Sequence, residues 1–76
     1  MIEARKLASR VEAAIKRADT DVIIDRAFYD DISDRLYINV VKGSRKTEIM
    51  LTIKDEKEID RLVEQGLLRL RNTPIG

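Results

Sequence analysis

Residues 35–53 alternate between apolar and polar side chains on both sides of a short turn, and this pattern constrains the fold most strongly. Leu36, Ile38 and Val40 share one parity before the turn Lys42-Gly43-Ser44. After the turn, the alternation resumes and four side chains are expected on the same face of the hairpin: Thr47, Ile49, Leu51 and Ile53. Period-two patterning around a glycine-containing turn is typical of an antiparallel hairpin with one buried face. Another part of the chain must therefore cover a row of leucine, isoleucine and valine.

Two amphipathic segments flank the hairpin and are predicted to be the helices that cover it. Residues 2–18 carry apolar side chains at helical spacing: Ala4, Leu7, Ala8, Val11, Ala14, Ile15 and Ala18. The second helix is predicted to begin with a capping-box-like pair, Asp55 and Glu58. Its apolar stripe contains Ile59, Leu62, Val63, Leu67 and Leu70.

Gly66 lies inside the second apolar stripe and allows two interpretations. In the first, the helix continues to about Asn72 and the glycine lets it approach the sheet. In the second, the helix ends at Gln65, Gly66 is its left-handed cap, and residues 67–71 form a short fourth strand. The stripe stays in phase across the glycine, which favours the continuous helix.

Residues 22–29 are predicted to form the first strand, but their apolar side chains do not keep one parity. Val22, Ile24 and Phe28 form the expected buried set, yet Arg26 has the same parity. An edge position for Arg26, or a β-bulge, would reconcile the two observations.

The predicted fold is α+β with the element order αβββα, a three-stranded antiparallel meander with two helices on one face. The 76 residues make a single domain, 1–76, with 73–76 as a frayed tail. A chain of this length buries only about 60% of its unfolded surface. The sequence has no cysteine for a disulfide and no histidine for the usual zinc sites. Self-association or unusually tight packing remains as a source of stability, and we expect a homodimer.

The same composition argues against catalysis, because neither a thiolate nor an imidazole base is available. We expect no enzyme activity, no cofactor, no metal site and no small-molecule substrate. Asp30, Asp31 and Asp34 lie close together but lack the ligand spacing of a calcium loop. No segment has the length and hydrophobicity of a signal peptide or a membrane span, so we expect a cytoplasmic protein without a membrane partner.

The other parity of the hairpin is more apolar than a freely solvated sheet face usually is. It is expected to expose four residues as an interaction surface: Tyr37, Asn39, Val41 and Met50. An exposed apolar patch of this kind marks an interface when it is contiguous. We therefore predict a small non-enzymatic binding or assembly module that self-associates through this face or through a sheet edge.

A nucleic-acid-binding protein is the alternative, because the charges occur in blocks. Residues 19–34 contain six acidic and one basic side chain, whereas residues 35–54 contain five basic and one acidic. A basic end is expected where the hairpin tip meets the end of the first helix, formed by Lys16, Arg17, Lys42, Arg45 and Lys46. Such a patch would bind phosphate with a steep salt dependence, whereas apolar self-association would not depend steeply on salt.

Overall fold

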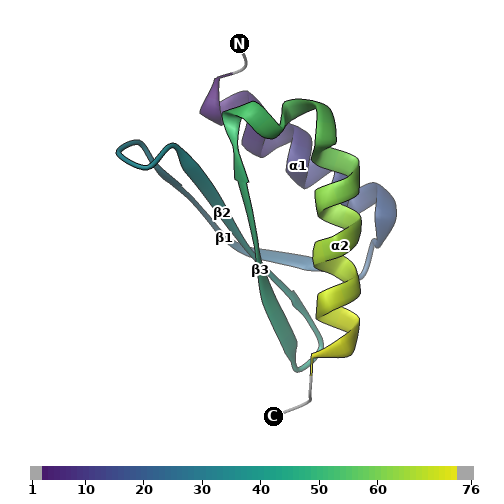
Figure 1. Cartoon of the computed structure of the whole chain (residues 1–76). Coiled ribbons are helices and arrows are strands. Elements are labelled where there is room, and N and C mark those ends of the chain that lie inside the picture. Colours follow the sequence, from purple (N-terminus) through teal and green to yellow (C-terminus); the bar gives the residue numbers. More distant parts are fainter. Residues whose placement is uncertain (1–2, 74–76) are drawn as a thin grey trace.

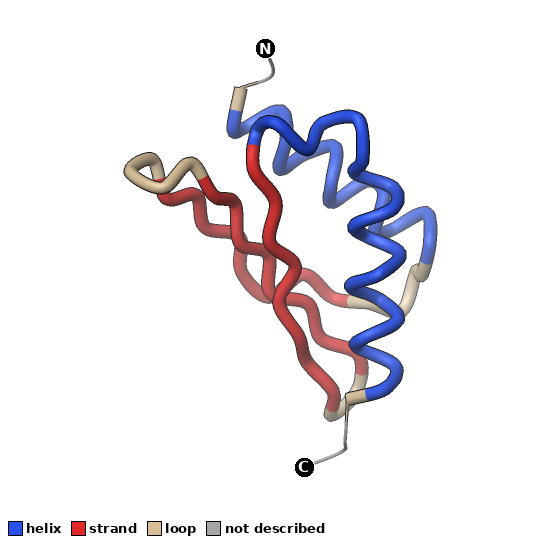
Figure 2. Tube along the Cα trace, viewed as in Figure 1, coloured by secondary structure: helices blue, strands red, loops and turns tan. Residues whose placement is uncertain are grey.

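The computed structural model describes residues 3–73 and shows the predicted αβββα fold. Its elements are α1 (Ala4–Ala18), β1 (Ile23–Asp30), β2 (Arg35–Lys42), β3 (Arg45–Thr52), the 3-10 helix η1 (Ile53–Glu58) and α2 (Ile59–Asn72). The strands form one antiparallel sheet in the order β1-β2-β3, and both helices lie on one side of it (Figure 1). Figure 2 shows the resulting helical and sheet layers. Ile2 in the first predicted helix and residues 74–76 of the predicted tail lie outside the described residues.

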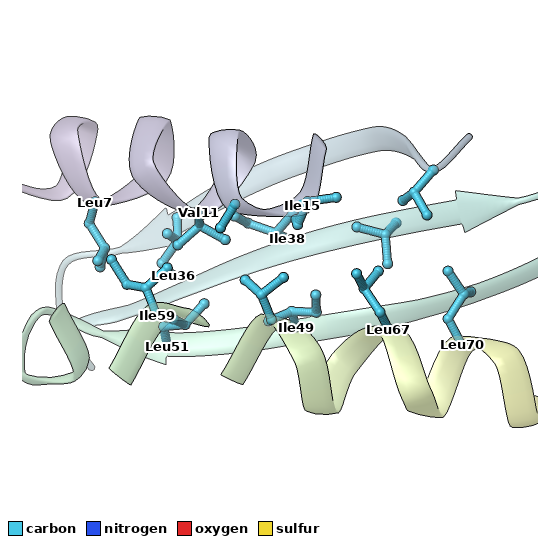
Figure 3. Packing of buried hydrophobic residues seen from close by; sticks show 14 residues of the cluster. Leu7, Val11, Ile15, Leu36, Ile38, Ile49, Leu51, Ile59, Leu67 and Leu70 are labelled. Carbon is cyan, nitrogen blue, oxygen red and sulfur yellow. The ribbon is translucent and has the colours of Figure 1, made fainter. Parts of the chain in front are cut away.

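The core lies between the two layers and follows the predicted alternation. Leu36, Ile38 and Val40 of β2 point toward the helices and are at most 1% exposed. Ile49 and Leu51 of β3 continue the same face. The helices contribute most residues of their predicted stripes, and Figure 3 shows how these side chains meet between the ribbons. The prediction was wrong for Ala18, which is exposed at the end of α1, and Ala4 lies outside the core cluster. One face of β2 and one face of β3 therefore belong to the core, whereas β1 contributes only the partly buried side chains of Ile24 and Tyr29.

A β-bulge in β1 resolves the mixed parity of its sequence. Ile24 pairs with Val40, but the next paired residue is Arg26, so Asp25 is the extra residue. The insertion moves every later side chain of β1 to the other face. Phe28 is consequently 56% exposed on the face away from the helices. The prediction that Phe28 belongs to the buried set was wrong for this reason.

The two turns of the meander lie at opposite ends of β2 and rely on different chemistry. Gly43 has φ +63° in the two-residue turn between Lys42 and Arg45, a conformation that glycine adopts without steric cost. In the other turn, a carboxylate oxygen of Asp30 accepts a hydrogen bond from the Ile32 N–H (3.0 Å). Each turn is therefore stabilised by local backbone geometry or hydrogen bonding.

The second helical region begins earlier than predicted. The capping box is formed by Thr52 and Asp55 rather than by Asp55 and Glu58, and it starts η1 instead of α2. The Thr52 N–H donates to a carboxylate oxygen of Asp55 at 2.8 Å. The threonine that ends β3 therefore also caps the following turn, which brings the helical region directly against the end of the sheet.

The helix α2 continues through Gly66 to Asn72, so residues 67–71 are helical and do not form a fourth strand. Gly66 is buried, and a Cβ built there would lie 2.4 Å from Cγ1 of Ile49 and 2.6 Å from its Cδ1. Such distances leave no room for a side chain. The glycine thus lets α2 approach β3 closely, as the first interpretation of the sequence proposed.

Replacing Gly66 with alanine is expected to destabilise the protein although alanine is the better helix former. Overpacking costs about 1–3 kcal/mol, which offsets the roughly 1 kcal/mol gained in helix propensity, so we expect a net loss of about 1 kcal/mol. Urea unfolding followed by circular dichroism measures this change. The double variant Gly66→Ala/Ile49→Ala should lose less than the sum of its single variants, because alanine at position 49 removes both Cγ1 and Cδ1. Strict additivity would contradict the close contact.

Candidate interaction surface

The sheet face opposite the helices, here called the outer face, is arranged by the strand register. Residues that pair directly across antiparallel strands point to the same side of the sheet. Phe28 pairs with Tyr37, and Tyr37 pairs with Met50. These three side chains form one continuous row across all three strands, here called the central row.

The central row is apolar and accessible. Phe28 is 56% and Met50 45% exposed, while Tyr37 between them is half-buried. The rings of Phe28 and Tyr37 stack with centroids 6.4 Å apart and an interplanar angle of 21°. Stacked aromatic pairs lose little conformational freedom when a partner covers them, which makes this row a preformed contact surface.

Two polar rows flank the central row, and each contains opposite charges. Arg26, Asn39 and Glu48 lie on the side of the β2–β3 turn. Asp30, Arg35 and Thr52 lie on the side of the β1–β2 turn. Because each row has one acidic and one basic side chain, the flanking rows carry no net charge and offer no concentrated field for phosphate.

A further row lies beyond Asn39, toward the β2–β3 turn. Ile23 pairs with Val41, and Val41 pairs with Lys46. Ile23 is 61% exposed. A shallow hollow borders this row and is lined by Asp25, Asn39, Val41, Lys46, Thr47 and Glu48. The outer face therefore has a second, smaller apolar contact next to its bulged strand.

All four residues of the predicted interaction surface lie on the outer face: Tyr37, Asn39, Val41 and Met50. Sequence reasoning missed Phe28 and Ile23, because the bulge at Asp25 separates their parities. The signal was present in Arg26, which shares the parity of Phe28 and could not be buried beside it. A bulge placed between Ile24 and Arg26 would have assigned both apolar residues correctly.

Both free edges of the sheet have features that interrupt their rows of backbone hydrogen-bonding groups. Arg69 of α2 donates to the main-chain carbonyl of Glu48 on β3 (N–O distance 3.0 Å), which occupies an acceptor of that strand. The β1 edge is interrupted by the bulge and carries the exposed charged residues Asp25 and Arg26. Bulges and charged side chains are the usual means by which an edge strand resists pairing with another strand.

The predicted basic end is only partly assembled. Lys42 at the hairpin tip forms an ion pair with Asp19, directly after α1 (Nζ–Oδ2 2.6 Å). Lys16 donates to the main-chain carbonyl of Val22 (3.1 Å). Arg17 instead forms an ion pair with Asp60 of α2 at 3.5 Å.

The remaining two predicted cations are close to the hairpin tip. Arg45 pairs with Lys42 across the turn, and Lys46 lies on the outer face beside Val41. Three of the five predicted phosphate ligands therefore already have partners within the described protein.

The hydrogen bond from Lys42 and the Asp21 backbone N–H lower the pKa of Asp19 below its usual value of 3.8. The Ser33 hydroxyl and the Ile32 N–H lower the pKa of Asp30 in the same way. The Tyr29 hydroxyl donates to Asp34, and this bond raises the pKa of the tyrosine. The carboxylates of Asp30 and Asp34 are thus engaged in local hydrogen bonds, and within residues 3–73 no group of three or more acidic residues is placed to hold a metal ion.

No protein-family model, curated protein or solved structure matches the chain. Among the residues that the structure describes, neither helix combines the length and the hydrophobicity needed to cross a membrane. The assignment of function therefore depends on the surfaces described above.

Removing the ion pair at the end of α1 should lower stability and flatten its acid dependence. The folded state lowers the pKa of Asp19, so its contribution is present above about pH 4 and is lost as the pH falls through the folded pKa. Asp19→Asn is expected to lower the melting temperature at pH 7 by a few degrees and by less near pH 2. Asp21→Asn removes the same charge nearby without removing the contact with Lys42 and serves as the control. Equal melting temperatures for the two variants at pH 7 would contradict a stabilising ion pair.

Proposed function

We propose that this protein is a small non-enzymatic assembly module that associates with a second copy of itself through the outer face. The observation that carries this proposal is the central row, in which Phe28, Tyr37 and Met50 form a contiguous apolar band across the whole sheet. Contiguous exposed apolar surface rimmed by polar residues is characteristic of protein interfaces.

The size of the chain supports association with a like partner. A 76-residue domain without disulfides has a limited core, and covering the central row would add buried apolar area. The balanced charges of the flanking rows also suit a self-complementary surface, because a two-fold interface brings the same patch of each copy together. A strongly charged face would instead repel its own copy.

The outer face is a better candidate than a sheet edge for this association. Edge pairing needs a row of accessible backbone N–H and carbonyl groups, and the bulge in β1 and the Arg69 side chain beside β3 interrupt such rows. Of the two routes expected from the sequence, we therefore propose face-to-face packing.

Nucleic-acid binding through the basic end is the competing proposal, and we place it second. The ion pairs of Lys42 and Arg17 reduce the positive charge available for phosphate. We assign no catalytic role to any described residue.

Charged substitutions in the central row should dissociate the dimer without unfolding the protein. The variant Phe28→Glu/Met50→Glu is expected to raise the dissociation constant of the dimer by at least about 100-fold, because four carboxylates would have to be desolvated in one interface. Sedimentation equilibrium measures this change, and a circular dichroism melt checks folding. Leu68→Glu is the matched control, since Leu68 is 55% exposed on α2 in the helical layer. Unchanged mass in the double variant, or equal dissociation in the control, would refute the proposal.

The competing proposal predicts a different dependence on salt. If all five cations of the basic end bound phosphates, raising the salt from about 50 to about 200 mM would weaken binding roughly 100- to 1,000-fold. Fluorescence anisotropy with labelled duplex DNA, single-stranded DNA and RNA tests this directly. We expect no tight binding at the lower salt concentration. Tight binding that falls on this scale, and that Lys42→Glu/Arg45→Glu/Lys46→Glu abolishes, would reverse the order of the two proposals.

A further inference from the structure

The strands of the outer face run from an acidic end to a basic end. The β1–β2 turn contains Asp31 and Asp34 and follows Asp30, whereas the β2–β3 turn is flanked by Arg45 and Lys46 and by Lys42, whose charge is paired with Asp19. Because β2 joins the two turns, they lie at opposite ends of the sheet (Figure 1). The middle rows of the face therefore carry no net charge, and the two ends of the strands carry opposite charges.

The side chain of Ile32 at the acidic end does not pack against the core. It is 94% exposed, the most exposed of the large apolar residues in the described structure. The turn that carries it is held by the Asp30 carboxylate, which accepts hydrogen bonds from the Ile32 N–H and the Ser33 hydroxyl (2.8 Å). Figure 2 shows this turn projecting at the left, away from the helices. An ordered turn thus presents an isolated isoleucine to solvent, which is the arrangement of an interface anchor.

We infer that two copies pack their outer faces in an inverted arrangement, in which the acidic β1–β2 turn of each copy covers the basic β2–β3 end of the other. This inference rests on the proposed function and specifies its geometry. The two-fold axis lies in the plane of the interface and crosses the strands at the central row, so the two β2 strands run antiparallel. Stacked sheets keep their strand directions within about 30° of each other, which this arrangement satisfies.

The strand register determines what the inverted arrangement brings together. The central row packs on its own copy, and the row of Asp30 lies over the row of Arg26 of the second copy. One step further along the strands, the turn with Ile32 and Asp31 lies over Ile23 and Val41 of the second copy, and Lys46 is the next member of that row, one strand away on β3. Asp30 therefore meets Arg26 of the second copy, whereas Glu48 meets Thr52, and Ile32 meets the second apolar contact of the outer face.

The other face-to-face arrangement, with the axis along β2, is disfavoured by the same charges. In that arrangement each row would lie on the same row of the second copy. The acidic β1–β2 turn would then meet the β1–β2 turn of the second copy, and the two hairpin tips would meet each other. Like charges juxtaposed across an interface oppose association and select against that partner orientation. Charge polarity along the strands thus selects the inverted orientation.

The area of the face also indicates that the turn takes part. Three strands of eight residues cover roughly 25 Å by 14 Å, or about 350 Å² per copy in projection. A stable interface usually buries about 800 Å² per partner. Contacts made by the projecting β1–β2 turn on the second copy would extend the interface beyond the strands on both sides of the axis.

A charge-exchange cycle tests the orientation. Asp31→Lys and Lys46→Asp are both exposed substitutions, and each should raise the dissociation constant of the dimer about tenfold, because each creates two like-charge contacts per dimer. The variant Asp31→Lys/Lys46→Asp exchanges the charges and should return to within about threefold of the starting protein. Sedimentation equilibrium at about 100 mM salt provides all four constants.

Each result decides a different point. The inverted arrangement is overturned if Asp31→Lys leaves the dissociation constant unchanged, or if the double variant weakens the dimer by the combined effect of its two single variants. Either result leaves self-association intact. A monomeric starting protein overturns the proposed function and this inference together. As an independent measurement, Ile32→Ser should raise the dissociation constant of the dimer about tenfold and leave the melting temperature of the monomer unchanged. Leu68→Ser should change neither quantity.

Discussion

Burial of one parity of β2 is the constraint on which the rest of the structure depends. Leu36, Ile38 and Val40 are sealed between the sheet and the helices. Burying three side chains of this size contributes roughly 5–9 kcal/mol before the entropic cost, which is similar to the whole free energy of unfolding of a small domain. A shift of one residue would turn all three outward, so the register of β2 with both neighbours is fixed. The alternate residues are then obliged to form the outer face, whatever their chemistry.

The fixed register makes the composition of the outer face informative. A face that only had to be soluble could carry charged residues at every position, yet Tyr37 and Met50 lie at its centre. The bulge at Asp25 adds Phe28 to the same row, although an unbulged strand would have pointed it toward the helices. Apolar area has therefore been moved away from the core and onto an accessible face. The proposed contact with another protein surface would account for this arrangement.

Most of the architecture could be predicted from the sequence, because the periodicity of residues 35–53 and of the two helical stripes is strong. The continuous helix through Gly66 followed from the phase of its stripe. The bulge could be suspected but not placed, because a single extra residue leaves no signal beyond mixed parity. The cap at Thr52 was missed because threonine at the end of a strand has its own propensity for β structure.

The candidate surface was predictable only where it belonged to a regular strand. Tyr37, Asn39, Val41 and Met50 followed from alternation alone. The expected basic end depended on which cations find carboxylates within the chain, and the pairing of Arg17 with Asp60 joins residues that are distant in sequence. Contacts of that kind depend on the packing of α1 against α2, which no local pattern specifies.

The Arg69 side chain against β3 also limits how large an assembly can become. Sheets that add strands at an edge present a new edge after every addition, so their growth has no natural end. A face that meets its own copy across a two-fold axis is fully used by one partner. Arg69 occupies one carbonyl of the β3 edge, and the bulge at Asp25 interrupts the β1 edge. If two copies associate through the outer face as proposed, the assembly would therefore stop at a pair.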